Sequence, residues 1–195
     1  MNDNILMLPE HKRLSELEGI IFDREGAHLA YLASLIPVGG TIVEIGSHKG
    51  KSACFMGSAL RRVKNITSKI HCVDLWTLGT DSVQASQQSL NMFTKQILDM
   101  RLSDYIVSHM EDSIEFSKKW NTPIDLLFID GEHHYEHVHS DWENFGKWVK
   151  KDGLVCFHDY VARHPDIQKV VNNEIPKNKW RFFARVDRMF TVQRM

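Results

Sequence analysis

The chain has 195 residues, of which 43% are hydrophobic, and its formal net charge is −1. This length supports one substantial hydrophobic core, so we expect a single domain over residues 1–195. A nearly balanced charge gives no general attraction to nucleic acid or to a membrane surface. We therefore expect a small-molecule partner that is selected by a pocket, and no nucleic-acid or membrane partner.

The cysteines and the N-terminus bear on the compartment. Cys54, Cys72 and Cys156 are odd in number, dispersed and in apolar context, which argues against a disulfide framework and is typical of a reducing compartment. Residues 1–18 contain no apolar stretch of signal-peptide length, and no run of about 18 apolar residues occurs anywhere. These observations predict a cytoplasmic location.

The first structured segment is helical. Residues 14–37 carry apolar side chains at helical spacing and end at Pro37, which predicts N-terminal helices over about residues 10–37. Five apolar runs follow, at 41–45, 70–73, 105–108, 124–129 and 154–157, separated by helical stretches such as 52–63 and 137–149. Alternation of this kind predicts parallel strands joined by crossover helices.

The C-terminal segment has a different pattern. Residues 181–186 and 189–192 alternate loosely around Asp187 and Arg188, which predicts an antiparallel hairpin at the sheet edge. The expected fold is therefore α/β: a doubly wound, mostly parallel seven-stranded sheet with an antiparallel C-terminal hairpin. Residues 76–100 are polar and long for a connection, and we expect them to form a lid that helps to shape the ligand pocket.

Two strand ends predict a nucleoside site. Residues 41–52 run from an apolar strand through Glu44 into a Gly-x-x-x-Gly turn, where backbone N–H groups at a helix start can face an anion. A second strand, at 69–74, ends in Asp74, a carboxylate placed to accept hydrogen bonds from ribose hydroxyls. Glu44 is placed to meet a cation such as an ammonium. A ligand with a carboxylate, an amine and a ribose would satisfy all three features.

The same turn allows other interpretations. A phosphate-binding P-loop needs four residues between its glycines, whereas three separate Gly46 from Gly50. Lys51 and Ser52 nevertheless leave a nucleotide-binding phosphotransferase or hydrolase as an alternative. An ordinary strand-to-helix turn, in which Gly50 only permits close packing, is the second alternative.

These segments resemble the class I S-adenosylmethionine (SAM)-dependent methyltransferases, in which E/D-x-G-x-x-x-G wraps the methionine moiety and an acidic residue ends the second strand. The resemblance runs from about residue 18 to the C-terminus. Residues 128–135, then Asp141, then residues 153–159 are similar to a subgroup with the patterns I-D-G-x-H-x-Y, a later D, and G-G-x-x-x-x-H-D. One of the two glycines is replaced by Asp152. This subgroup is similar to small-molecule O-methyltransferases, including those that modify macrolide sugars.

The resemblance implies SAM as cofactor and a set of cofactor-binding residues. Trp76 is placed to cover the purine or ribose face, and Asp112 and Ser113 lie in a segment that borders the adenine, although a helix-capping role alone would also explain them. The implied set is Glu44, Gly46, Ser47, His48, Gly50, Ser52, Asp74, Trp76, Asp112, Ser113 and Asp130.

Polar residues also end the fourth and fifth strands. Asp130, His158 and Asp159 should converge on the ligand crevice, where they could hold Mg²⁺ or Mn²⁺. Metalloenzymes similar to this subgroup have an acidic residue at the position of His158, so the metal remains open. In the alternative, His158 and Asp159 only hydrogen-bond each other and hold a loop.

His133 lies three residues after Asp130 and is the favoured general base for a substrate hydroxyl, because imidazole titrates near neutral pH. Asp130 would orient the acceptor. Residues 133–137 also match H-x-x-E-H, a zinc-peptidase signature, but the motif begins directly at a strand end, which disfavours that interpretation.

The sequence thus predicts a SAM-dependent O-methyltransferase acting on a small hydroxylated molecule, such as a sugar or natural-product intermediate. A catalytically silent binding subunit with the same fold is a further alternative. A metal-dependent oxygenase is a more distant alternative. Aromatic residues in the helix at 142–148 would permit a homodimer.

Overall fold

The structure is a computed structural model that describes residues 5–77 and 83–195. Its strands are β1 (Thr41–Ile45), β2 (Lys69–Asp74), β3 (Ile106–Met110), β4 (Ile124–Ile129), β5 (Val149–Phe157), β6 (Trp180–Val186) and β7 (Met189–Arg194). Its helices are α1 (His11–Ser15), α2 (Asp23–Leu35), α3 (Lys51–Arg62), α4 (Val83–Asp99), α5 (Ser113–Ser117), α6 (Tyr135–Gly146), α7 (Pro165–Lys169) and the π-helix η1 (Val170–Glu174).

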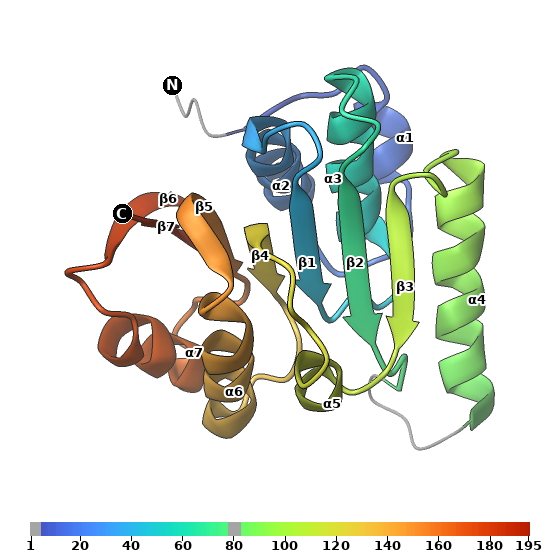
Figure 1. Ribbon diagram of the computed structural model, residues 1–195. Coiled ribbons are helices and arrows are strands. Elements are labelled where there is room, and N and C mark those ends of the chain that lie inside the picture. The colour runs from blue at the N-terminus through green and yellow to red at the C-terminus, as the bar shows by residue number, and fades with distance from the viewer. Residues whose placement is uncertain (1–4, 78–82) are drawn as a thin grey trace.

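The strands form one sheet in the order β3-β2-β1-β4-β5-β7-β6 (Figure 1). The first five strands are parallel, and β7 runs antiparallel to both β5 and β6. The expected doubly wound sheet with a C-terminal hairpin is therefore confirmed. Ile45 is in register with Val73 and with Ile129, so β1, β2 and β4 end at the same edge of the sheet.

Both faces of the sheet are covered by helices. Neighbouring side chains of a strand point to opposite faces, so Ile42 packs with the cluster under α1–α4 and Val43 with the cluster under α5–α7. β4 is buried at every position, as its apolar run predicted. Figure 1 shows α2 and α3 on one face and α5 and α6 on the other. Such a three-layer arrangement leaves the strand ends as the place for a site.

Some boundaries differ from the predicted ones. β5 begins at Val149, earlier than residue 154, because Val149 pairs with Ile124 although the next three residues are exposed and polar. α6 begins at Tyr135, two residues before the predicted start.

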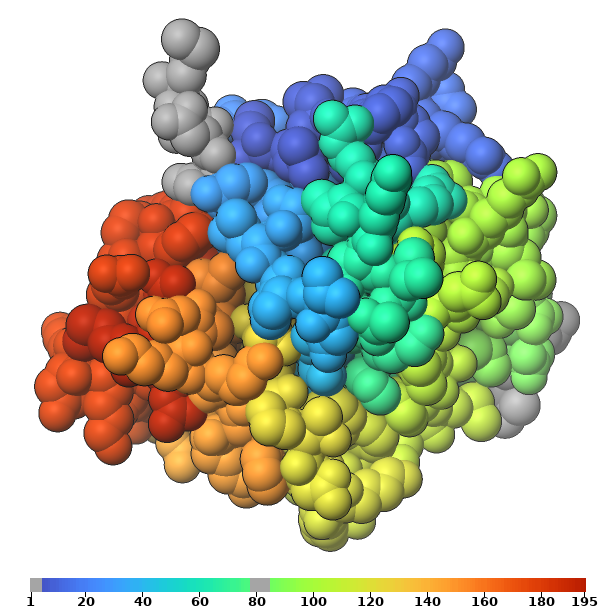
Figure 2. Space-filling view, turned by 45° about the horizontal axis from the view of Figure 1, so that its top comes forward, coloured from blue at the N-terminus to red at the C-terminus, as the bar shows by residue number. Residues whose placement is uncertain are grey.

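The expected lid needs correction in part. Its residues 83–99 form α4, where Phe93 and Ile97 are buried in the core, so this helix is an integral layer of the fold. Residues 78–82 lie outside the described residues. Figure 2 shows the N-terminal segment, in dark blue, along the top of the molecule, where it meets the green part of the chain at the upper right. There Arg13 donates to the backbone oxygen of Asp99.

The aromatic residues expected to permit a homodimer are largely internal. Trp142 and Phe145 are buried, and the indole of Trp142 packs edge-on against Trp180 with ring centroids 5.0 Å apart. Trp148 is partly exposed, and the homodimer stays a prediction. Within the described part of the chain, no helix has the length and apolar character required to cross a membrane.

Candidate active site

A cavity of about 400 Å³ opens at the edge where the parallel strands end. This size lies within the range of roughly 300–1,000 Å³ that is common for small-molecule sites. Most of the residues that the sequence singled out line it: Gly46, Ser47, His48, Gly50, Ser52, Asp74, Asp112, Ser113, Asp130, His133, His158 and Asp159. The N-terminal residues Gly19, Ile20 and Ile21 add an apolar part of the wall.

The turn after β1 requires its two glycines. Gly46 and Gly50 have φ values of 84° and 83°, which belong to the left-handed region. A Cβ on Gly46 would lie 2.2 Å from the backbone oxygen of Asp130, and one on Gly50 would lie 2.7 Å from the Phe93 ring. The turn is therefore pressed between β4 and α4, and α3 begins at Lys51 with its N-terminus toward the cavity.

Asp74 fixes two loops at the cavity wall. Its carboxylate accepts hydrogen bonds from the backbone N–H of His48 at 2.7 Å and of Trp76 at 2.5 Å. A carboxylate held in this way keeps further lone pairs for ligand hydroxyls.

Trp76 does not cover the cavity as expected. Its side chain is 1% exposed, packs against Phe93 at 5.1 Å between ring centroids, and donates from Nε1 to the backbone oxygen of His48. The indole lies beneath the turn after β1, because burial of a large aromatic ring is favourable when its N–H has a hydrogen-bond partner.

Glu44 is also placed differently from the expectation. It is fully buried behind the turn and does not line the cavity, so its carboxylate cannot meet a ligand ammonium in this arrangement. Oε2 accepts from the Cys72 thiol at 3.1 Å, while Oε1 has no hydrogen-bond partner. Burial raises the pKa of Glu44 to about 7, against the opposing effect of the Ser52 and Ser47 hydroxyls.

This raised pKa predicts a pH-dependent stability. Folded Glu44 binds its proton more tightly than the unfolded chain does, so its contribution is complete below about pH 4.5 and is lost as the pH rises toward 7. We expect Glu44→Gln to become more stable relative to wild type between pH 5 and 8, by about 2–3 kcal/mol. Urea unfolding of wild type and Glu44→Gln at pH 5 and pH 8 measures this change. The same stability difference between the two proteins at both pH values would contradict the prediction.

Lys51 argues against the phosphate-binding alternative. Its Nζ donates to the backbone oxygen of Ser15 at 3.0 Å and lies 3.7 Å from Asp23. The side chain is 9% exposed and is directed to the N-terminal segment. Although Lys51 is among the residues that line the cavity, its amine is engaged by the N-terminal segment.

Asp112 and Ser113 do line the cavity, and both also have structural roles. Asp112 caps α5 by accepting from the N–H groups of Ile114 and Glu115 at 3.0 and 3.1 Å. The Ser113 hydroxyl donates to Asp141 at 2.6 Å, and burial raises the pKa of Asp141 to about 6. The predicted cap is confirmed, whereas contact with adenine remains a prediction.

His158 is the centre of a buried charge network. Nδ1 lies 2.8 Å from Oδ1 of Asp130 and 3.3 Å from Oδ2 of Asp159, while Nε2 lies 3.2 Å from Oε2 of Glu25. Arg188 binds Glu25 through two nitrogens, at 2.9 and 2.7 Å, and reaches Asp159 at 3.2 Å. Asp130, His158 and Asp159 therefore converge as expected.

The pKa values in the network reflect this mutual attraction. Burial alone would lower the pKa of His158, but the surrounding carboxylates, Asp130 first, raise it to about 11. Burial likewise opposes the charge of Glu25, yet hydrogen bonds from His158 and Arg188 lower its pKa to about 2. The network thus favours a positive charge at His158.

Asp130, His158 and Asp159 could bind a metal ion in place of the proton on His158. Nδ1 of His158 is buried without a completed hydrogen bond, although two carboxylate oxygens are near it. Its other nitrogen is held by a carboxylate, which is the usual arrangement of a histidine that binds a metal. We call Asp130, His158 and Asp159 the inner set; their donor atoms lie within 4.8 Å of one another.

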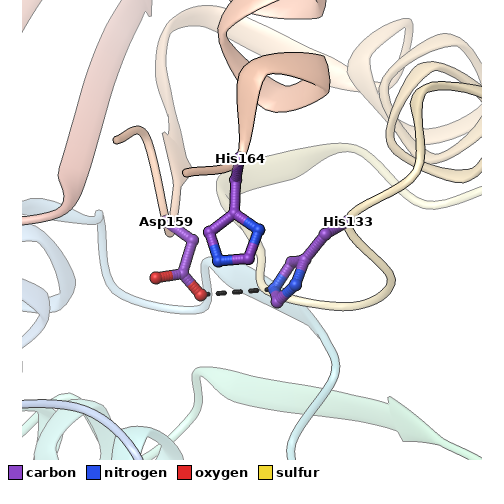
Figure 3. Close-up of side chains that lie close together, drawn as sticks. All are labelled: His133, Asp159 and His164. Carbon is purple, nitrogen blue, oxygen red and sulfur yellow. Dashed lines mark ion pairs between the residues drawn. The ribbon is translucent and has the colours of Figure 1, made fainter. Parts of the chain in front are cut away.

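His133 lies beside this network and faces the cavity. Its Nε2 is 3.2 Å from Oδ2 of Asp159, and its side chain is 41% exposed (Figure 3). The Asp159 carboxylate raises the pKa of His133. His133 precedes α6, which begins at Tyr135, so His133 and His137 do not share a helix face as a zinc-peptidase motif would require.

We compared the chain with protein families, with curated proteins and with solved structures. A methyltransferase domain family matches residues 43–160, which is more than half of the chain. The chain belongs to this methyltransferase family. The uncharacterized protein R132 of Acanthamoeba polyphaga mimivirus is 30% identical over 140 residues, which cover 68% of this chain and 58% of R132. Protein y4gI of Sinorhizobium fredii is 28% identical over 127 residues, which cover 63% of this chain and 13% of y4gI.

Solved structures share the fold of this chain. The O-methyltransferase NovP has a TM-score of 0.73 at 15% identity, with 98% of this chain and 92% of NovP covered. TomG of Streptomyces achromogenes, solved with SAM, has a TM-score of 0.69 at 14% identity, with 97% and 91% covered. The O-methyltransferase of Bacillus cereus, solved with SAH, has a TM-score of 0.69 at 13% identity, with 94% and 86% covered. The predicted family and fold are confirmed; the macrolide-sugar subgroup remains a prediction.

Sequence reasoning missed three residues of the candidate site: Glu25, His164 and Arg188. Glu25 follows Asp23 and Arg24 in the charged first turn of α2, so no local pattern distinguished it. Arg188 lies in the predicted hairpin turn, where a charged residue is ordinary. His164 has no motif around it, since it only precedes the helix that starts at Pro165.

Proposed function

We propose that this protein transfers a methyl group from SAM to a hydroxyl of a small molecule. The observation that carries the proposal is the shared cavity: the turn after β1 and Asp74 line one part, and Asp130 and His133 line another. A cofactor bound by the first part would present its methyl group to an acceptor held by the second. Aligning the reacting atoms can contribute roughly 7–11 kcal/mol to such a reaction.

His133 serves as the general base. With Nε2–H donated to Asp159, Nδ1 is the nitrogen that can accept a proton. As the acceptor oxygen bonds to the methyl carbon, the carbon–sulfur bond breaks and its electron pair returns to sulfur. The hydroxyl proton moves to Nδ1 of His133, and Asp159 stabilises the resulting imidazolium. Asp130 orients the acceptor.

A divalent cation is the second element of the proposal. Mg²⁺ or Mn²⁺ would be held by Asp130, His158 and Asp159, and would supply polarisation of the acceptor hydroxyl. The mixed oxygen and nitrogen donors of this set suit Mn²⁺ better than Mg²⁺.

The acceptor that we propose is a sugar or another natural-product intermediate. The motifs around Asp130 and His158 are similar to those of the sugar-modifying subgroup, and one solved structure of the same fold is a TDP-rhamnose 3′-O-methyltransferase of calicheamicin biosynthesis. The exposed Ile20 and the neighbouring Ile21 would contact the acceptor's apolar parts. A panel of hydroxylated sugars and aromatic natural products, assayed with SAM, tests this choice.

Calorimetry with SAM and with its demethylated product SAH tests the cofactor directly. We expect both to bind with one molecule per chain. Binding of neither would overturn the proposal, whereas ATP or GTP binding that is lost in Lys51→Ala would favour the phosphotransferase alternative.

Asp74→Asn is expected to weaken SAM binding roughly ten-fold or more, because a hydrogen bond to a charged acceptor contributes about 1.5–3 kcal/mol. The amide oxygen can still accept from one of the two backbone N–H groups that Asp74 holds. Calorimetry gives the affinity, and a thermal melt shows whether the loops remain folded. Wild-type affinity in a folded Asp74→Asn protein would exclude Asp74 as a cofactor ligand.

A further inference from the structure

Two histidines and one carboxylate meet at the mouth of the cavity, beside the inner set. His133 comes from the loop after β4, Asp159 follows β5, and His164 precedes α7 (Figure 3). Their donor atoms lie within 4.8 Å of one another. The rings of His133 and His164 are 4.3 Å apart between centroids, at an angle of 50°. We call His133, Asp159 and His164 the outer set.

The donor atoms of the outer set select a different kind of ion from those of the inner set. Two imidazole nitrogens and one carboxylate oxygen suit Zn²⁺, Co²⁺ or Ni²⁺, whereas Mg²⁺ and Ca²⁺ require mostly oxygen. Three protein ligands with an open position are the usual composition of an accessible zinc site. The outer set has this open position, because all three residues line the cavity and His133 is 41% exposed.

The carboxylate of the outer set is held in place. Oδ1 of Asp159 pairs with Arg188 at 3.2 Å and with Arg163 at 3.5 Å, which leaves Oδ2 directed to the histidines. The backbone N–H of His164 donates to the backbone oxygen of Val161 at 3.0 Å, and Pro165 begins α7 directly after it. The carboxylate of Asp159 and the backbone of His164 are therefore both held in place by contacts within the protein.

We propose that His133, Asp159 and His164 form a binding site for a first-row transition-metal ion of the Zn²⁺ type. Oδ2 of Asp159 is common to both sets, at 3.2 Å from His133 Nε2 and 3.3 Å from His158 Nδ1. An ion bound by the outer set would therefore compete with the inner set for this oxygen. It also occupies His133, so Zn²⁺ inhibits methyl transfer; this consequence rests on the proposed function, whereas ion binding does not.

Calorimetric titration of the full chain with Zn²⁺, without SAM, tests the site. We expect one tightly bound ion, and a loss of affinity of at least ten-fold in His164→Ala. His134→Ala is the matched control, because His134 neighbours His133 but is 76% exposed and points to Glu132 instead. Titration with Co²⁺ should give the visible absorption of a nitrogen-ligated ion, and His164→Ala should change that spectrum.

Several results would overturn the proposal. Equal Zn²⁺ affinity in His164→Ala and wild type would do so, as would an equal loss in His134→Ala. Loss of binding in Asp130→Asn with binding retained in His164→Ala would place the ion in the inner set. Circular dichroism and thermal melts confirm that each variant is folded. If Zn²⁺ binding depends on His164 but SAM and SAH do not bind, the metal site stands and the proposed function fails.

Discussion

Replacing His133 with alanine is expected to lower the turnover of methyl transfer at least ten-fold, while SAM affinity stays at the wild-type value. General base catalysis contributes roughly 10²–10⁴ in rate, which sets the upper part of the expected range. The affinity should persist because the proposed cofactor contacts come from Asp74 and the turn after β1, whereas His133 pairs with Asp159. Single-turnover kinetics with an identified acceptor and calorimetry with SAM measure the two quantities separately.

His134→Ala provides the control for this prediction, since His134 is directed to Glu132 at 2.8 Å and away from the network. It should retain full turnover. Wild-type turnover in His133→Ala would remove His133 from the mechanism.

The same residue predicts a pH dependence. A base must be neutral to accept a proton, and Asp159 raises the pKa of His133 above its usual value of 6.5. Turnover should therefore be full at alkaline pH and fall as the pH drops through the raised pKa. A pH–rate profile of wild type shows this limb. We expect the limb to be absent from the residual activity of His133→Ala.

Replacing Glu25 with glutamine is expected to cost about 3–5 kcal/mol of unfolding free energy, because it removes a buried negative charge that pairs with both His158 and Arg188. Glu25 is fully buried, and its carboxylate joins Arg188 of the hairpin turn to His158 at the end of β5. Glutamine has nearly the same shape, so packing is preserved and the lost charge is the main change. Urea unfolding at pH 7 measures the difference.

Arg24→Ala is the matched control for Glu25→Gln. Arg24 is the neighbouring residue, and its only ion pair among the described residues is at 3.7 Å to Asp187, with the Arg24 side chain 58% exposed. Such a pair contributes about 0–1 kcal/mol. A loss of less than about 1 kcal/mol in Glu25→Gln would show that the network does not stabilise the fold.

The pH dependence of this contribution has a definite sign. The folded pKa of Glu25, about 2, is lower than its usual value of 4.5. Its contribution is therefore present above pH 4.5 and is lost as the pH falls toward 2. Wild type and Glu25→Gln should accordingly converge in stability under acidic conditions.

Sequence alone determined the fold and the family because their signals are local. The apolar run of β1 leads directly into the Gly46–Gly50 turn, and the apolar run of β2 ends directly in Asp74. Each signal is therefore local, and parallel strands bring the two strand ends to one edge. The position of Asp130, His133, His158 and Asp159 around one cavity follows from the same rule.

Only the tertiary structure decided which groups surround these residues. Glu25 and Arg188 are 163 residues apart, and their contact depends on how α2 and the β6–β7 turn pack at the sheet edge. His164, which precedes α7, lies next to His133 of the loop after β4, although the two residues belong to different segments of the chain. Burial likewise depends on neighbours distant in sequence, which is why Glu44 and Trp76 lie under the loops and not at the cavity wall. Local patterns specify strands and turns, whereas contacts between distant segments arise only when the layers pack.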